Sequence, residues 1–311
     1  MKNFITVIIA TYNRCRDLQN TLESLLRQEI NDEFDHEVIV VDNNSNDATK
    51  EVVQSFMDKF SGKLKYLVES KQGRSFALNS GLKVAKGSVL AMTDDDCLLD
   101  KAWLKNIDKN FKEKDIDILT GKIVPVFNSP KPAWLDLNND IFKGAYVCFD
   151  LGDEFIDNTR REILPYGANS IFKKSSLDKF GDFLKSGRGE DTEIFYRWAQ
   201  KGARIGYAPD VIVYHVTPDS RLNKNYLRKW HFLNGKNCAE IFSQYKNNQG
   251  GRKFLNVPFW LYKRAIYSVW RALKGKILFR KSNLVDELWA YYHCGVVWHF
   301  LGKKTKFDNL R

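Results

Sequence analysis

The first hundred residues alternate between two hydrophobic periodicities, and this alternation limits the fold more than any other feature of the chain. Apolar runs typical of strands are separated by segments whose apolar residues recur every three or four positions, the spacing of a helix. The predicted strands are 4–10, 37–41, 65–68 and 88–92, and the helices between them are 17–27, 48–60 and 75–85. This order predicts an α/β fold with a mostly parallel sheet flanked by helices.

The remaining sequence is mixed and then becomes basic and aromatic. The expected elements are strands at 117–126 and 211–216, and helices at 190–201, near 255–280 and at 283–301. The polar, glycine-containing segment 247–251 predicts a linker. We therefore expect an α/β domain over residues 1–218, followed by a mainly helical, basic region over 219–311.

Charge is distributed unevenly between these two parts. Lys and Arg total 49 and Asp and Glu total 38, a net charge of +11. Residues 1–218 contain 30 basic and 33 acidic side chains, a net of −3, whereas residues 219–311 contain 19 and 5, a net of +14. Nucleic acid, anionic lipid and a solvated basic surface are all compatible with this excess. Five cysteines without a CxxC pair predict reduced thiols, a cytoplasmic setting and no structural zinc site.

Three consecutive aspartates, Asp94, Asp95 and Asp96, follow the apolar run 88–92. Carboxylates this close repel one another unless a cation or solvent compensates, and Mg²⁺ and Mn²⁺ prefer carboxylate oxygens. A solvated acidic turn is the alternative interpretation. Another strand ends in Asp42, and ligands of parallel sheets bind beyond the carboxyl ends of strands. The position of the three aspartates therefore favours a metal site over a turn.

A second acidic group, Glu190 and Asp191, follows the glycines Gly187 and Gly189 at the expected start of a helix. The helix dipole keeps a carboxylate ionised there, and an ionised carboxylate can act as a general base. An N-capping acidic pair without chemistry is equally compatible with this stretch alone. His215 ends an apolar strand, where it is either structural or, beside a metal site, a ligand.

Five segments taken in order resemble the family 2 glycosyltransferases, which have the GT-A fold and use nucleotide-diphosphate sugars. The resemblance covers about residues 4–218. The segments are VIIATYNR, VIVVDNNSNDAT, QGRSFALNSGLKVAKGSVLAMTDDDCLLD, YGANSIFKKSSLDKFGDF and GRGEDTEIFYRWAQKGARIGYAP. The resemblance implies a GT-A, Rossmann-like sheet and transfer of the sugar with inversion at the anomeric carbon.

The resemblance also implies roles for individual residues near the donor. Asp42 would accept a hydrogen bond from the ring N–H of the base, which suits uracil. Arg74 and Asn79 would lie near the diphosphate and sugar, and Asn169 would lie close to the transferred sugar. The nucleotide pocket would be lined by Thr11, Tyr12, Asn13 and Arg14.

The same resemblance assigns the acidic residues. Asp94 and Asp96 would form the DxD pair with Asp95 between them, Asp96 binding the Mn²⁺ or Mg²⁺ directly and Asp94 lying nearer the sugar or ribose. Asp191 would be the catalytic base with Glu190 beside it. The His215 position is a metal ligand in part of the family.

Two other classes of protein remain as alternatives. A nucleotidyltransferase would need a glycine-rich, basic phosphate loop at the first turn, which ATYNR does not supply. A catalytically silent sugar-nucleotide-binding or membrane-scaffold protein would not need the intact DxD and acidic pair. The polymerases of the family carry a QxxRW motif and several spanning helices, and this sequence shows neither. We therefore expect transfer of a single sugar to a glycan or lipid-linked acceptor in surface polysaccharide biosynthesis.

The basic C-terminal part combines helical spacing with aromatic rings. The longest uncharged stretch there, 288–302, is shorter than the roughly 20 residues of a spanning helix, so we expect no integral segment. Apolar residues of 255–280 alternate with lysines, arginines, Trp260 and Trp270, a composition typical of a helix in a membrane interface. A helical subdomain with a charged outer face is the alternative. No nucleic-acid motif accompanies the charge, so we predict a peripheral location on the inner face of the cell membrane.

Overall fold

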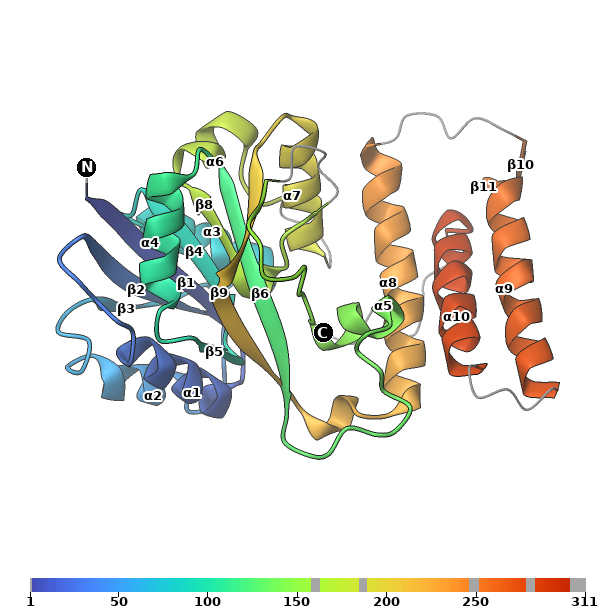
Figure 1. Ribbon diagram of the computed structural model, residues 1–311, viewed down its shortest axis with the longest axis horizontal. Helices are drawn as coiled ribbons and strands as arrows, with labels where there is room; N and C mark the ends of the chain where they lie inside the picture. Colours follow the sequence, from blue (N-terminus) through green and yellow to red (C-terminus); the bar gives the residue numbers. More distant parts are fainter. Residues whose placement is uncertain (1, 158–162, 185–188, 246–251, 278–282, 303–311) are drawn as a thin grey trace. The chain divides into compact units, whose positions relative to one another are not determined.

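The computed structural model describes residues 2–157, 163–184, 189–245, 252–277 and 283–302 (Figure 1). The predicted linker at 247–251 and Gly187 lie outside these residues. The chain divides into two compact units, the first formed by Met1–Asn128 and Val147–Thr217, the second by Ser129–Tyr146 and Pro218–Arg311.

A single mixed sheet forms the centre of the first unit. Its strands are β1 (Asn3–Thr11), β2 (Phe34–Asp42), β3 (Leu64–Val68), β4 (Val89–Asp94), β5 (Cys97–Leu99), β6 (Ile118–Phe127), β7 (Ile156–Asp157), β8 (Ser170–Lys173) and β9 (Ile205–Thr217). Their order is β3-β2-β1-β4-β8-β6-β9-β5, and β7 pairs with β9. The strands β1 to β4 pair in parallel, as do β6 and β9, whereas β8 is antiparallel to both β4 and β6. The predicted α/β fold with a mostly parallel sheet is confirmed.

Helices cover both faces of this sheet. They are α1 (Cys15–Leu26), α2 (Thr49–Phe56), α3 (Arg74–Val84), α4 (Trp103–Glu113), α6 (Ser175–Phe180) and α7 (Glu190–Gln200). Side chains alternate between faces along a strand. Ile5, Val7 and Ile9 of β1 pack in one core with α1, α2 and α4, and Ile8 packs in the other with α3 and α7. All four β1 side chains are fully buried.

The register of the parallel strands places the predicted site residues at one edge of the sheet. In the β1–β2 pair, Asp42 lies opposite Thr11, and in the β1–β4 pair, Asp94 lies opposite Ala10. The carboxyl ends of β2 and β4 therefore flank the end of β1. This is the edge where parallel sheets bind ligands.

The second unit is mainly helical. It contains α5 (Asp140–Lys143), α8 (Lys224–Tyr245), a hairpin of β10 (Lys253–Phe254) and β11 (Val257–Pro258), α9 (Phe259–Ile277) and α10 (Asn283–Phe300). Helix α10 lies between α8 and α9 and packs against both (Figure 1). A Cβ on Gly295 of α10 would lie 2.0 Å from the carbonyl oxygen of Phe232, so only glycine permits this approach to α8. None of the described helices is both long enough and apolar enough to cross a membrane.

Candidate active site

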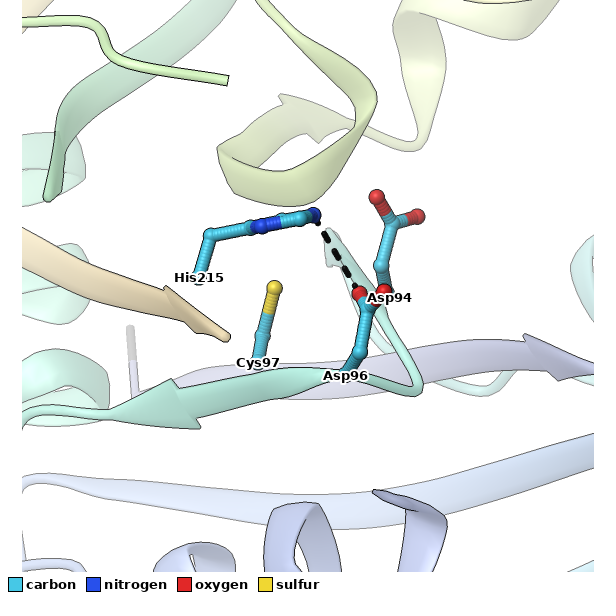
Figure 2. A group of neighbouring side chains, drawn as sticks. All are labelled: Asp94, Asp96, Cys97 and His215. Atoms are coloured by element: carbon cyan, nitrogen blue, oxygen red, sulfur yellow. Dashed lines mark ion pairs between the residues drawn. The ribbon is translucent and has the colours of Figure 1, made fainter. Parts of the chain in front are cut away.

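Four side chains from β4, β5, the turn between them and β9 converge into a possible metal site. One ligand atom from each of Asp94, Asp96, Cys97 and His215 lies within 4.8 Å of the others. Figure 2 shows the His215 ring directed at Asp96, whose Oδ1 is 3.3 Å from His215 Nε2. The pairing of β5 with β9 creates this arrangement, because it places Cys97 directly opposite His215. The structure therefore brings the predicted ligands Asp94, Asp96 and His215 together.

The polar atoms of this cluster fit a divalent cation. Asp96 Oδ1 and His215 Nδ1 are buried and form no hydrogen bond with any part of the chain that the structure describes. A buried polar atom without a partner costs free energy, and a bound cation would supply that partner for the Asp96 oxygen. Two carboxylates and one imidazole suit Mn²⁺, and the carboxylates alone suit Mg²⁺.

Arg14, in the loop that follows β1, binds Asp95 and Asp96. Its Nη1 lies 2.6 Å from Asp96 Oδ2 and 3.1 Å from Asp95 Oδ1. Thr11 donates a hydrogen bond of 2.7 Å to the other oxygen of Asp95. Burial, opposed by Arg14 and reinforced by Asp96, raises the pKa of Asp95 to about 7. Asp95 therefore ties the loop to the sheet, while Asp96 keeps one oxygen facing His215.

Arg74, at the start of α3, connects the metal cluster with the second acidic group. Its Nη2 lies 2.5 Å from Asp94 Oδ1, and its Nη1 lies 2.7 Å from Glu190 Oε1. Burial raises the pKa of the Asp94 carboxyl, but the charges of Arg74, His215 and Arg14 outweigh this and leave it lowered. The aspartate run and the Glu190–Asp191 pair therefore meet at one guanidinium, although 94 positions separate Asp96 from Glu190 in the chain.

Backbone donors hold Asp191, the second residue of α7. The N–H of Gly167 donates to Asp191 Oδ2 at 2.9 Å, and the N–H of Thr192 donates to Oδ1 at 2.7 Å. Burial and the neighbouring charge of Glu190 raise the pKa of Asp191, although Arg74 opposes them. A half-buried carboxylate with a raised pKa has the properties of a general base.

The residues predicted to line the nucleotide pocket lie at the ends of β1 and β2 and on the loop after β1. Asp42 accepts a hydrogen bond of 2.6 Å from the Tyr66 hydroxyl and one of 2.8 Å from the N–H of Ser45. Asn13 has a left-handed backbone, with φ of 53°, and its amide oxygen accepts from the N–H of Asn46. Tyr12 is exposed. These contacts join the two loops, and Asp42 lies opposite Thr11 at the edge of the sheet.

Asn79 and Asn169, two of the residues predicted to lie near the donor, form hydrogen bonds with the protein itself. Asn79 donates to the carbonyl oxygen of Phe183, and its own amide oxygen is buried without a partner within the described residues. Asn169 is fully buried, accepts from the Trp103 indole N–H and donates to the carbonyl oxygens of Lys122 and Val211. Asn169 therefore joins α4, β6 and β9 behind the site, and its predicted proximity to the sugar stays a prediction.

Three residues important for the geometry were not predicted. Gly167 approaches so closely that a Cβ there would lie 3.0 Å from the Arg74 guanidinium and 3.2 Å from Asp191 Oδ2. Asn43 accepts from the N–H of Gly73 and donates to two carbonyl oxygens of the preceding loop, which fixes the start of α3. Cys97 directly follows the three aspartates, so its place in the chain was the available signal.

The model of the family described as glycosyl transferase family 2 matches residues 6–181. Glycosyltransferase AglE of Haloferax volcanii is 32% identical over 230 residues, which cover 72% of this chain and 71% of AglE. Succinoglycan biosynthesis protein ExoM of Rhizobium meliloti is 23% identical over 300 residues, covering 96% of this chain and 94% of ExoM.

A similar fold is found among solved structures. The mannosyltransferase PcManGT of Pyrobaculum calidifontis, solved in complex with GDP-Man and Mn²⁺, superposes with a TM-score of 0.66 at 19% identity. The superposition covers 98% of this chain and 89% of the mannosyltransferase. At this identity the similarity shows the fold alone.

Proposed function

Because the chain belongs to glycosyl transferase family 2, we propose that it is an inverting, metal-dependent glycosyltransferase acting on a UDP-sugar. It would move a single sugar to a hydroxyl of a glycan or lipid-linked acceptor in surface polysaccharide biosynthesis. Membership in the family makes the chain a glycosyltransferase, so the nucleotidyltransferase and silent-protein alternatives are set aside. The proposal concerns the donor nucleotide, the stereochemistry of transfer, the metal and the acceptor.

The observation that carries this proposal is the position of Arg74 between two acidic groups. One guanidinium contacts Asp94 of the DxD segment and Glu190 of the acidic pair, at 2.5 and 2.7 Å. A leaving diphosphate and a base on the acceptor side must lie within one sugar of each other, and this contact supports that arrangement. Arginine also binds phosphate oxygens well, because its planar fork of donors matches them.

The cation would be held by Asp94, Asp96 and His215, whose ligand atoms already lie together. When bound, it stabilises the negative charge that develops on the leaving diphosphate. Acidic side chains outnumber basic ones around this position. The guanidinium groups of Arg14 and Arg74 are surrounded by five carboxyl groups, those of Asp94, Asp95, Asp96, Glu190 and Asp191. This excess of carboxylates supports a divalent cation at the site.

Asp191 is the proposed base. The acceptor oxygen bonds to the anomeric carbon from the face opposite the diphosphate, Asp191 takes the hydroxyl proton, and the bond to the diphosphate oxygen breaks. Glu190 is less suited because Arg74 pairs with its Oε1. Backbone donors hold both Asp191 oxygens in place, and each oxygen retains a lone pair for the proton.

The proposed uridine specificity rests on Asp42. Its two oxygens accept from Tyr66 and Ser45, and a carboxylate oxygen can accept a second hydrogen bond. A ring N–H of uracil would supply it. GDP-mannose enters the test as the competing donor, because it is the donor bound to the mannosyltransferase with a similar fold.

A thermal-shift panel tests the donor and the metal together. We expect a UDP-sugar to raise the melting temperature with Mn²⁺ or Mg²⁺ but not with EDTA, and GDP-sugars to have no effect. A shift with GDP-mannose alone would overturn the uridine assignment. Stabilisation that is equal with and without metal would overturn the metal assignment. Asp96→Asn is the control, since it should remove the metal-dependent part of the shift.

The predicted peripheral position on the inner face of the cell membrane is also a proposal. It would place the enzyme near lipid-linked acceptors. The net positive charge and the exposed aromatic side chains of the second unit support this location.

A further inference from the structure

After Leu261, which is buried in the core, helix α9 packs small residues inward and exposes large apolar ones. The side chains of Ala265, Ser268 and Ala272 are buried, and so is Gly275. A helix of a soluble protein normally buries its large apolar side chains against the core. The opposite arrangement lets α9 approach α10 closely and leaves most of its bulky apolar side chains exposed.

The exposed apolar residues of α9 form one continuous sector. Ile266 is 67% exposed, Trp270 52%, Leu273 54% and Ile277 74%. At about 100° per residue, these four side chains and Val269 fall within a sector of about 100°. Exposed apolar surface that is contiguous marks an interaction site more often than scattered residues do.

The adjacent sector of α9 is basic. Lys263, Arg264, Arg271 and Lys274 are all exposed, and α9 contains no acidic residue. Arg264 and Lys274 lie over the rings of Trp260 and Trp270. Only Arg271, which lies 2.6 Å from Asp286, forms an ion pair among the described residues of this sector. Basic groups and amphipathic rings beside an apolar face match the boundary between lipid headgroups and acyl chains.

A groove of about 290 Å³ between α9 and α10 opens on the basic sector. Arg264, Arg271 and Trp289 line it, together with His293, whose Nδ1 lies 2.7 Å from the Ser268 hydroxyl. Burial and the nearby charge of Arg264 lower the pKa of His293. Asp286 also lines the groove and pairs with Arg271, so Arg264 is the guanidinium that could bind an anion there, beside aromatic walls.

The hairpin that precedes α9 exposes two more apolar residues at its tip. Phe254 is 58% exposed and Leu255 is 64% exposed. Leu255 and Asn256 both have left-handed backbones, with φ of 48° and 64°. Leucine is disfavoured at positive φ, where glycine or asparagine is usual. Insertion of the exposed Phe254 and Leu255 side chains into an apolar medium would bury apolar area and offset this backbone cost.

We propose that the α9 face and the β10–β11 tip form a site for an anionic membrane surface. Ile266, Trp270, Leu273 and Ile277 enter the acyl boundary, the basic sector contacts lipid phosphates, and the groove with Arg264 receives one phosphate. A second copy of the chain is the other possible occupant of an apolar face. It would bring Lys263 and Lys274 against like charges, so charge complementarity favours an anionic leaflet.

Flotation of the full chain with vesicles tests this site. We expect binding to vesicles of phosphatidylcholine with phosphatidylglycerol, little binding to phosphatidylcholine alone, and weakening by salt. Replacing Ile266, Trp270 and Leu273 by serine should raise the vesicle dissociation constant by at least about tenfold. The matched control replaces the exposed residues Ile30, Val68 and Val84 of the first unit by serine and should change it little.

A second pair of variants tests the basic sector. Glutamine at Lys263, Arg264 and Lys274 should weaken binding by about fivefold per charge at low salt. The control places glutamine at the exposed residues Lys50, Lys86 and Lys109 of the first unit. Thermal unfolding of each variant verifies that the fold is retained.

Three results would overturn the proposal. They are failure of the full chain to bind anionic vesicles, full binding by the Ile266, Trp270 and Leu273 variant, and equal effects of the α9 variants and their controls. A solution mass of two chains that falls to one in the apolar variant, without vesicle binding, would assign the face to a second copy. None of these measurements depends on sugar transfer, so they are independent of the proposed reaction.

Discussion

Arg14 Nη1 lies 2.6 Å from Asp96 Oδ2, on the carboxylate whose other oxygen faces His215. A guanidinium this close repels a cation that binds the same carboxylate, even though it stabilises the aspartates when no cation is bound. Arg14 is partly exposed, so solvent reduces the repulsion, and we take about 1–2 kcal/mol as its size. The residue therefore opposes metal binding before the donor arrives and supplies a positive charge for the diphosphate afterwards.

We therefore expect Arg14→Gln to bind Mn²⁺ more tightly without donor, by about tenfold, and to bind a UDP-sugar more weakly. Calorimetric titration with Mn²⁺ alone, followed by titration with UDP, separates the two effects. Arg14→Lys keeps the charge and serves as the control. Weaker Mn²⁺ binding by Arg14→Gln would show that the arginine positions Asp96 for the metal instead of competing with it.

His215 and Cys97 lie opposite each other on β9 and β5, but we expect only His215 to bind the metal. Burial, followed by the charges of Asp94 and Asp96, raises the pKa of the Cys97 thiol well above its usual value, so the thiol stays protonated. Mn²⁺ and Mg²⁺ prefer oxygen and imidazole ligands over a protonated thiol.

His215→Gln should raise the Mn²⁺ dissociation constant by about tenfold or more, and Cys97→Ser should leave it nearly unchanged. Electron paramagnetic resonance of free Mn²⁺ measures both variants in the same way. Equal losses would indicate that the pair acts through packing, since both side chains are buried.

The sequence predicted the fold best where the pattern was local. Strands β1 to β4 and the helices between them alternate at the periods expected of them, and the aspartates at the ends of β2 and β4 follow from that. Strand β8 was not predicted, because four residues provide little periodicity and its antiparallel pairing with β4 and β6 depends on residues far away in the chain. The helix α4 was overlooked although Trp103, Leu104, Ile107 and Phe111 have helical spacing.

The candidate site was predictable to a similar extent. The residue types in the aspartate run and in Glu190–Asp191 carry their own chemical signal, so both were found. The pairing of Arg74 with both groups was not predictable, since it depends on how α3 and α7 come together at the sheet edge. The full burial of Asn169 was also not predictable, because its hydrogen bonds to Trp103, Lys122 and Val211 join segments that are far apart in the chain.

Gly167 offers a test of the geometry between Arg74 and Asp191. A methyl group there would meet the guanidinium at 3.0 Å and Asp191 Oδ2 at 3.2 Å, which is tighter than normal contacts. Both contacts are with side-chain ends that can shift, so we expect Gly167→Ala to fold with nearly unchanged stability but to lose at least about tenfold in kcat. Melting temperature and transfer rate are the two measurements. Unchanged kcat would mean that Arg74 and Asp191 tolerate displacement and are not positioned for the reaction.

The raised pKa of Asp191 predicts how activity depends on pH. Burial is the main cause, and the charge of Glu190 adds to it. As a base, Asp191 must be ionised, so kcat falls as pH decreases through a pKa above the usual aspartate value. Glu190→Gln removes the neighbouring negative charge and should move this acid limb to lower pH, whatever it does to the maximal rate.

Asp191→Asn removes the base itself while keeping nearly the same shape. We expect transfer to be abolished and UDP-sugar binding to remain largely intact, because the metal cluster and Arg74 are unchanged. Asp210, which lies on β9 away from these contacts, gives a matched control as Asp210→Asn. Normal turnover by Asp191→Asn would show that Asp191 is not the base. For the pH prediction, an acid limb at the same pH in the wild type and in Glu190→Gln would show that the charge of Glu190 does not affect the pKa of Asp191.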